Sequence, residues 1–126
     1  MDYLKTQHTV SELILSIRSR RLQRAAFVNE THWEIALFVI ESSNLGKTID
    51  ISGLAHITGK SRNTIIAQVG FMEKEGYLVS LIDQYDQRRK IVLPTETLRA
   101  EFDRFTKSIA PDIAKASYKI QQSITL

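Results

Sequence analysis

The sequence predicts an α-rich (α+β) fold in which helices surround a single β-hairpin. Apolar residues recur at helical spacing over most of the chain, and two β-branched runs flank a polar turn at residues 83–88. Two short helical segments, joined by a glycine turn, directly precede this hairpin. Together these observations predict a winged helix-turn-helix with a two-stranded β wing and flanking N- and C-terminal helices.

Composition limits the class of protein. A chain of 126 residues with 43% hydrophobic and 25% charged residues suits one globular domain. It has no cysteine, which excludes disulfides and thiolate metal sites. No apolar run approaches the ~20 residues of a membrane span, and polar residues interrupt any signal-peptide core near the N-terminus. We therefore expect a cytoplasmic protein with no membrane contact. Its net charge of +3 is compatible with nucleic-acid binding.

The first helix is expected from about residue 10 to 27. Thr9 and Glu12 have the spacing of a capping box, and apolar residues follow at helical period. The other face carries four arginines, which form either a solvated face or a rim that touches phosphates. They are Arg18, Arg20, Arg21 and Arg24.

Three further helices are expected before the hairpin. A second capping box, Thr31 to Glu34, opens a helix that is apolar almost all round and closes near Asn44 and Gly46. A short helix spans residues 50–58. After Gly59, Ser61 caps a fourth helix that stops at Gly76.

The hairpin and the last helices complete the chain. Residues 77–82 and 89–93 are the expected strands of the wing. A fifth helix follows Thr95, and Pro111 suits the first turn of a sixth helix.

The residues most informative about function lie between 54 and 69. Ala55 permits close approach of two helices, Gly59 makes the turn, and Ser61 caps the second helix, as in a helix-turn-helix. The start of that second helix would face DNA bases and phosphates in a major groove. The candidate contacts are Lys60, Ser61, Arg62, Asn63, Thr64 and Gln68. The alternative is that they are only cap and surface residues of a helical pair.

The wing adds three adjacent cations, Arg88, Arg89 and Lys90. A basic wing tip could straddle the phosphate backbone or enter the minor groove, where the negative potential favours arginine. Asp86 lies two residues before Arg88 and could pair with it to fix its direction. The alternative is a hairpin tip that only maintains solubility.

Residues from about 31 to 98 resemble the winged-helix core of the MarR family of bacterial regulators. The matching residues are Leu54-Ala55, the turn from Gly59 to Ser61, Thr64-Ile65, Val69, Met72-Glu73, Gly76 to Val79, Asp86-Gln-Arg88 and Thr95. The resemblance implies that Arg88 enters the minor groove and that residues 61–64 occupy the major groove. It also implies a dimer interface on the terminal helices and a small aromatic or phenolic effector between those helices and the winged helix.

Apolar stripes on the terminal helices support a homodimer, because leftover apolar stripes usually mark an interface. The candidate interface residues are Leu13, Ile14, Ile17, Ile113, Ile120 and Ile124. A two-fold dimer would present two recognition helices to half-sites ~34 Å apart.

The sequence thus predicts one winged-helix domain over residues 1–126. Residues 1–30 form an N-terminal dimerisation helix, 31–98 the winged helix-turn-helix core, and 99–126 the C-terminal dimerisation helices. The expected function is sequence-specific binding of double-stranded DNA as a homodimeric transcription regulator, with repression favoured by analogy. We expect no catalytic constellation, no metal site and no cofactor, because the three histidines are scattered and no Gly-rich phosphate loop occurs. The alternative is a winged-helix protein-interaction module, which Ile66 and Ala67 on the presumed DNA face favour.

Overall fold

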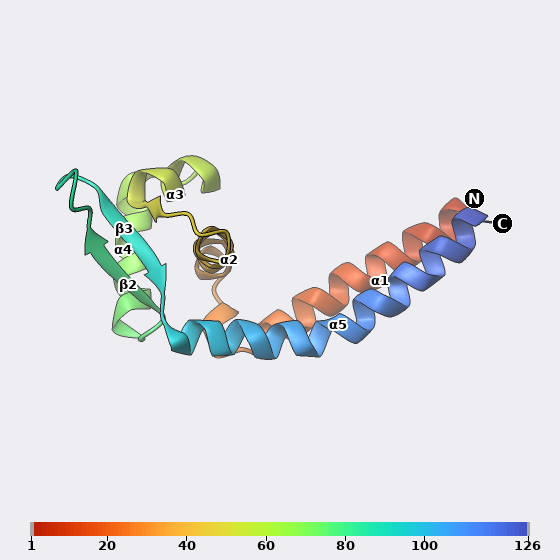
Figure 1. The fold of residues 1–126 in the computed structure, drawn as a ribbon. Coiled ribbons are helices and arrows are strands. Elements are labelled where there is room, and N and C mark those ends of the chain that lie inside the picture. Colours follow the sequence, from red (N-terminus) through yellow and green to blue (C-terminus); the bar gives the residue numbers. More distant parts are fainter. Residues whose placement is uncertain (1, 126) are drawn as a thin grey trace. The chain divides into compact units, whose positions relative to one another are not determined.

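A computed structural model describes residues 2–125 and divides them into two compact units (Figure 1). The helical unit consists of the chain up to residue 25 and from residue 102 onward. The winged-helix unit is Ala26–Glu101.

The helical unit pairs helix α1, Tyr3–Leu22, with the later part of helix α5, Glu96–Thr125. The predicted start of the first helix is wrong, since α1 begins seven residues earlier than position 10. Asp2 is the N-cap, and its side chain accepts a hydrogen bond from Lys5 N–H at 3.1 Å. Thr9 instead lies buried within α1, where its hydroxyl donates to the Lys5 carbonyl at 3.1 Å. A capping motif therefore occurs here inside a helix.

The predicted break at Pro111 is also wrong, because α5 continues through it. A proline inside a helix removes one backbone hydrogen bond and crowds the preceding turn. Residues on both sides of Pro111 are buried, with Ile109 3% exposed and Ala116 6% exposed. We attribute the continuity of α5 to this burial.

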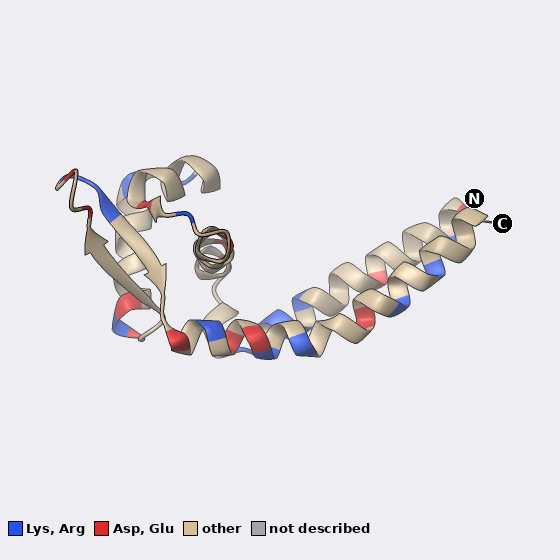
Figure 2. Cartoon of the chain, viewed as in Figure 1, with Lys and Arg blue, Asp and Glu red and all other residues tan. Residues whose placement is uncertain are grey.

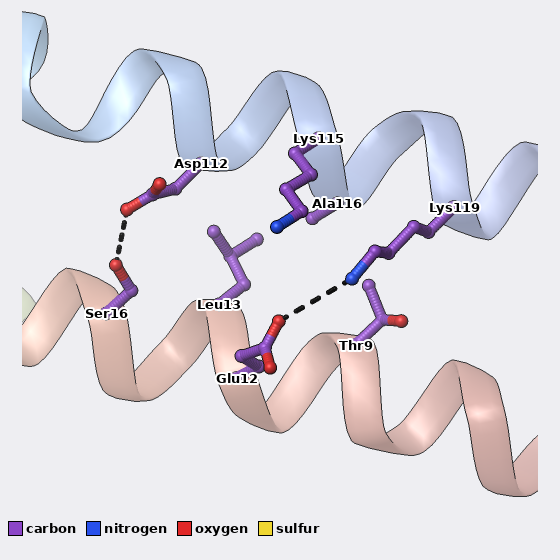
Figure 3. Close-up of a pocket in the computed structure, with 8 residues that line it drawn as sticks. All are labelled: Thr9, Glu12, Leu13, Ser16, Asp112, Lys115, Ala116 and Lys119. Atoms are coloured by element: carbon purple, nitrogen blue, oxygen red, sulfur yellow. Dashed lines mark hydrogen bonds and ion pairs between the residues drawn. The ribbon is translucent and has the colours of Figure 1, made fainter.

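Polar contacts hold α1 and α5 together along a shallow cleft of about 220 Å³ (Figure 3). The Ser16 hydroxyl donates to Asp112 at 2.5 Å, and Lys119 Nζ lies 3.8 Å from Glu12. Four of the eight residues that line the cleft are thus paired with one another across it.

The winged-helix unit contains α2, Glu30–Asn44, α3, Ile51–Thr58, and α4, Arg62–Lys74, after a short 3₁₀ turn η1, Ala25–Phe27. The predicted cap of the second helix is wrong by two residues. Asn29 caps α2 by accepting from His32 N–H at 3.0 Å, so Thr31 already lies within the helix. Fully buried side chains from the helices and the sheet form one core. They include Phe27, Ile35, Leu54, Ile65, Met72, Val92 and Leu98.

The predicted hairpin is present as β2, Leu78–Ile82, and β3, Lys90–Pro94. A further strand that the sequence did not predict, β1, Ile49–Asp50, makes the sheet three-stranded, in the antiparallel order β1-β3-β2. Asp50 lies opposite Ile91, so β1 joins the wing to the start of α3. Two residues are too few to show alternation in the sequence.

Gly70 lies inside α4, and close packing does not explain the glycine, because a Cβ placed there would meet no neighbouring atom within 4 Å. Gly70→Ala should therefore raise the free energy of unfolding by ~0.5–1 kcal/mol, since alanine costs less backbone entropy in a helix. Urea denaturation measures the change. The matched substitution Gly59→Ala should instead destabilise, because Gly59 has a φ of +70°. Equal effects of the two changes would contradict this explanation.

Candidate nucleic-acid interface

The turn between α3 and α4 has the local geometry predicted for a helix-turn-helix. Gly59 ends α3 in the left-handed conformation, with a φ of +70°. Ser61 then caps α4, its hydroxyl oxygen accepting from Thr64 N–H at 3.1 Å. Arg62, Asn63 and Thr64 consequently occupy the exposed first turn of α4. Backbone N–H groups at such a turn favour anions.

The side chains of this turn differ in how firmly they are held. Arg62 donates from its guanidinium to the Ser52 hydroxyl of α3. Asn63 is exposed and has no side-chain partner among residues 2–125. The turn therefore presents one oriented cation and one free amide.

Two other predicted DNA contacts are engaged by α2. Lys60 Nζ lies 3.7 Å from Glu34, and Gln68 Oε1 lies 2.6 Å from His32 Nε2. To reach a phosphate, Lys60 or Gln68 would have to break the contact with its α2 partner, or contact both at once.

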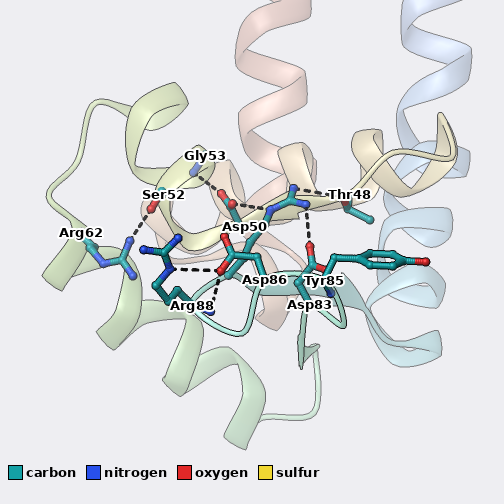
Figure 4. A network of polar contacts seen from close by, with 10 residues as sticks. Thr48, Asp50, Ser52, Gly53, Arg62, Asp83, Tyr85, Asp86 and Arg88 are labelled. Atoms are coloured by element: carbon teal, nitrogen blue, oxygen red, sulfur yellow. Dashed lines mark hydrogen bonds and ion pairs between the residues drawn. The ribbon is translucent and has the colours of Figure 1, made fainter.

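The wing tip projects Arg88 into solvent, with 93% of its side chain exposed. The predicted pairing with Asp86 is present: Asp86 Oδ1 accepts from Arg88 Nε at 3.3 Å and from its backbone N–H at 3.1 Å. Asp83 organises the other side of the tip by accepting from Tyr85 N–H at 2.8 Å. The tip is thus two side-chain-stabilised turns that carry an exposed arginine (Figure 4).

Arg89 and Lys90, the other two predicted wing cations, have acidic neighbours. Arg89 donates to Asp50 at 2.7 Å, to Asp83 at 3.1 Å and to Thr48 at 3.3 Å. Lys90 Nζ lies 4.0 Å from Glu73 and is half exposed. Of the three cations, Arg88 is the one that the structure presents most openly.

The contacts of Arg89 alter the acidity of its partners. Partial burial would raise the pKa of Asp50, but hydrogen bonds from Gly53 N–H and Arg89, with the Arg89 charge, lower it overall. The Tyr85 N–H and the Arg89 guanidinium likewise lower the pKa of Asp83. Hydrogen bonds to Asp50 and Asp83 raise the pKa of Arg89 in turn.

These shifts predict how stability responds to acid. A carboxylate whose pKa is lower in the folded than in the unfolded state stabilises the fold above its unfolded pKa. For Asp50 and Asp83 that contribution should be complete above the ordinary value of 3.8 and be lost as the pH falls through their lower folded values. As the pH is lowered below 3.8, the urea midpoint of the parent should therefore decrease more steeply than that of an Asp50→Asn/Asp83→Asn double variant. Parallel profiles would contradict the role of these two groups.

Sequence analysis missed Thr48, Asp50 and Asp83 as parts of this site. Asp50 was visible only as the start of a helix, and Asp83 only as a turn residue. Their partner Arg89 lies 39 residues from Asp50 in the sequence, so no local pattern could link them.

Charge in the winged-helix unit is mixed (Figure 2). Basic residues occur at the start of α4 and along the wing, close in sequence to the acidic residues Asp50, Glu73, Asp83 and Asp86. The unit is therefore not a uniform basic surface, and any DNA contact depends on a few exposed cations.

The six predicted dimer residues lie in the helical unit and fall into two groups. Leu13, Ile17 and Ile120 are half-buried, whereas Ile14, Ile113 and Ile124 are exposed at 59%, 46% and 57%. The second group leaves apolar surface on both helices.

Several solved structures share this fold. The S. aureus MepR–DNA complex aligns with a TM-score of 0.71 at 14% identity, over 98% of this chain and 94% of that one. NadR in complex with 4-hydroxyphenylacetate aligns with a TM-score of 0.71 at 19% identity, over 94% and 79%. A MarR-family transcriptional regulator from Rhodococcus sp. RHA1 aligns with a TM-score of 0.61 at 15% identity, over 86% and 73%.

The chain has the MarR-type winged-helix fold. The resemblance drawn from residues 31–98 is thereby confirmed at the level of fold. No family model matches the sequence, and no curated protein matches it. The likeness to MarR regulators is therefore carried by the three-dimensional arrangement.

The described residues also bear on membrane spans and metal sites. Within residues 2–125 no helix is both long and apolar enough to cross a bilayer. The same residues contain no cluster of three His, Asp or Glu side chains that could hold a metal ion.

Proposed function

We propose that the protein is a sequence-specific, double-stranded-DNA-binding transcription regulator that acts as a homodimer, with repression as its mode. The observation that carries this proposal is the joint exposure of the first turn of α4 and of Arg88 on the wing, in a fold shared with a protein solved in complex with DNA. These are the two elements that a winged helix inserts into DNA grooves.

The first turn of α4 supplies suitable chemistry for the major groove. Arg62 can bind guanine in a bidentate way, and the free amide of Asn63 can bind adenine. The hydroxyls of Ser61 and Thr64, with the N–H groups of the turn, suit phosphates. Lys60 and Lys90 are second-rank contacts in this proposal because each lies near a glutamate and is less exposed than Arg88, and Gln68 is second-rank because it is part-buried against His32.

A dimer would allow two copies of the proposed interface to contact two half-sites of one duplex. Ile14, Ile113 and Ile124 expose apolar side chains on the paired helices of the helical unit, as a two-fold interface requires. Binding through two linked recognition helices raises affinity by ~10²–10⁴ over one helix alone.

The test is affinity for duplexes selected from a random pool, measured by fluorescence anisotropy at several salt concentrations. Arg62→Ala or Asn63→Ala should lose ~1–3 kcal/mol of binding free energy and relax the preference at one base position. Arg88→Ala should weaken binding to all duplexes and lower the slope of log affinity against log salt by ~1. Lys107→Ala, which removes the same charge from an exposed site on α5, is the control and should change neither quantity appreciably.

Two binding results would contradict the proposed interface. If the parent bound no duplex at low salt, or if Arg62→Ala, Asn63→Ala and Arg88→Ala all bound like the parent, the proposed interface would be wrong. The second candidate function, a protein-interaction module, would then take its place. Ile66 favours that candidate, because it is 48% exposed on α4 beside exposed Ala67. A protein partner that co-purifies without nucleic acid would support it.

A small-molecule effector is a further part of the proposal. The resemblance implies an aromatic or phenolic ligand, and NadR was solved in complex with 4-hydroxyphenylacetate. Addition of 4-hydroxyphenylacetate should raise the melting temperature of the protein if this ligand class binds. An unchanged melting temperature at millimolar concentration would exclude this compound as an effector.

A further inference from the structure

Besides the β1–β3 pairing, the side chain of Arg89 connects the wing to the start of α3. We call the group formed by Thr48, Asp50, Asp83 and Arg89 the wing anchor. Its central guanidinium bonds three oxygen-bearing side chains, two from residues 48–50 and one from residue 83. Thr48 precedes β1, Asp50 ends β1, and Asp83 follows β2. Only arginine has the planar fork needed to hold such a set at once.

Asp50 connects the wing anchor to α3, the first helix of the helix-turn-helix. One oxygen accepts from Arg89 Nε at 2.7 Å, and the other accepts from Gly53 N–H at 2.7 Å to cap α3. Next to it, Ser52 accepts the hydrogen bond from Arg62 of α4 (Figure 4). The first turn of α4 and the wing are therefore both hydrogen-bonded to residues at the start of α3.

Gly53 belongs to this arrangement because it leaves space for the carboxylate. A Cβ at Gly53 would lie 3.1 Å from Asp50 Oδ1 and 3.3 Å from Ile49 Cγ1. The absence of a side chain thus lets Asp50 serve α3 and Arg89 together.

Backbone pairing alone holds the wing tip weakly. The β1–β3 ladder has two residue pairs, and Asp50 opposite Ile91 is the one nearer the tip. Between Ile82 and Lys90 the chain is joined to itself by turns, with Asp83 N–H donating to the Arg89 carbonyl at 2.9 Å. The side-chain contacts of Arg89 are the ones that connect this segment to α3.

We propose that Arg89 is a positioning residue for DNA binding, which holds the tip that carries Arg88 at a fixed place relative to the first turn of α4 and makes no phosphate contact itself. This role rests on the function proposed above. Two carboxylates already balance the charge of Arg89, so a phosphate contact would have to displace them. A preorganised tip avoids the entropy cost of ordering it when DNA binds.

A charge-preserving variant separates positioning from direct contact. Lysine binds phosphate well, but its single ammonium cannot bridge Thr48, Asp50 and Asp83 as the fork does. Arg89→Lys should therefore weaken DNA binding about fivefold to tenfold while the salt slope stays that of the parent. Asp83→Asn, which removes one carboxylate from the wing anchor, should weaken binding in the same way.

A double-mutant cycle with Arg88→Ala then tests how Arg89 acts. If Arg89 works by placing Arg88, then Arg89→Lys should have almost no further effect on affinity once Arg88 is alanine. A purely structural role would reduce affinity equally in both backgrounds. Circular dichroism melting of every variant confirms that each is folded under the binding conditions.

Three outcomes would overturn the proposal. Arg89→Lys that binds like the parent would show that the wing anchor does not set affinity. Losses from Arg88→Ala and Arg89→Lys that simply add would show that the two residues act separately. A parent that binds no duplex at low salt would overturn the proposed function, and the positioning role with it, whereas the first two outcomes overturn only the role of Arg89.

Discussion

In the proposed homodimer, Ile14→Glu/Ile113→Glu should give a folded monomer and lower the affinity for a two-half-site duplex by at least ~100-fold. Both isoleucines are exposed in the helical unit, so a glutamate at either position is compatible with the helix itself. In a two-fold interface each substitution is present twice, and four unpaired carboxylates would be desolvated. Losing the second recognition helix removes the ~10²–10⁴ gain of linked binding.

Sedimentation equilibrium measures the first effect, and anisotropy with single and double half-site duplexes measures the second. Ser19→Glu is the control, because it adds one such charge at an exposed polar position of α1. The control should remain dimeric. Affinity for a single half-site should be nearly unchanged in the double variant, since the winged-helix unit is not altered. A double variant that stays dimeric would show that the interface lies elsewhere.

Phe27→Ala should lower the free energy of unfolding by ~3–5 kcal/mol. Phe27 has 0% of its surface exposed, and its ring meets that of Trp33 edge-on, with centroids 5.1 Å apart. Removing the ring takes away buried apolar area and leaves a cavity that its neighbours fill only in part. Since small proteins have only ~5–15 kcal/mol of stability, this one change could unfold much of the population at 37 °C.

Urea denaturation followed by circular dichroism gives the size of the loss. Phe71→Ala is the matched control: the residue type and the atoms removed are the same, but Phe71 is 57% exposed on α4. Its effect should stay within ~0.5 kcal/mol, as for ordinary surface positions. Similar losses in the two variants would contradict the view that Phe27 is central to the core.

Local signals predicted the functional part of the fold well. Gly59 and Ser61 fixed the turn between α3 and α4, because a left-handed residue and a capping hydroxyl are both needed there. Thr95 was expected to open the fifth helix, and its hydroxyl accepts from Leu98 N–H at 3.2 Å. Each of these signals acts within a few residues, which is why the sequence alone is sufficient.

Features that depend on distant neighbours were not predictable in this way. A capping motif at Thr9 and a helix start at Pro111 are both sound local interpretations, yet packing of α1 with α5 overrides them. The role of Arg89 depends on Asp50, which the fold brings to it from 39 residues away. Sequence analysis therefore located the candidate site but could not show which of its cations already has partners.

The helical unit is made from the two ends of the chain, and this has a consequence for synthesis on the ribosome. The Thr6 hydroxyl lies 2.9 Å from that of Ser123, so α1 is fully paired only when the residues up to 123 have been translated. The winged-helix unit, residues 26–101, lies between them and can fold first from contiguous chain. At ~5–20 residues per second, α1 waits on the order of ten seconds with its apolar side uncovered. In a polysome, that nascent helix is open to premature capture by another copy, or by a chaperone, before its own chain is complete.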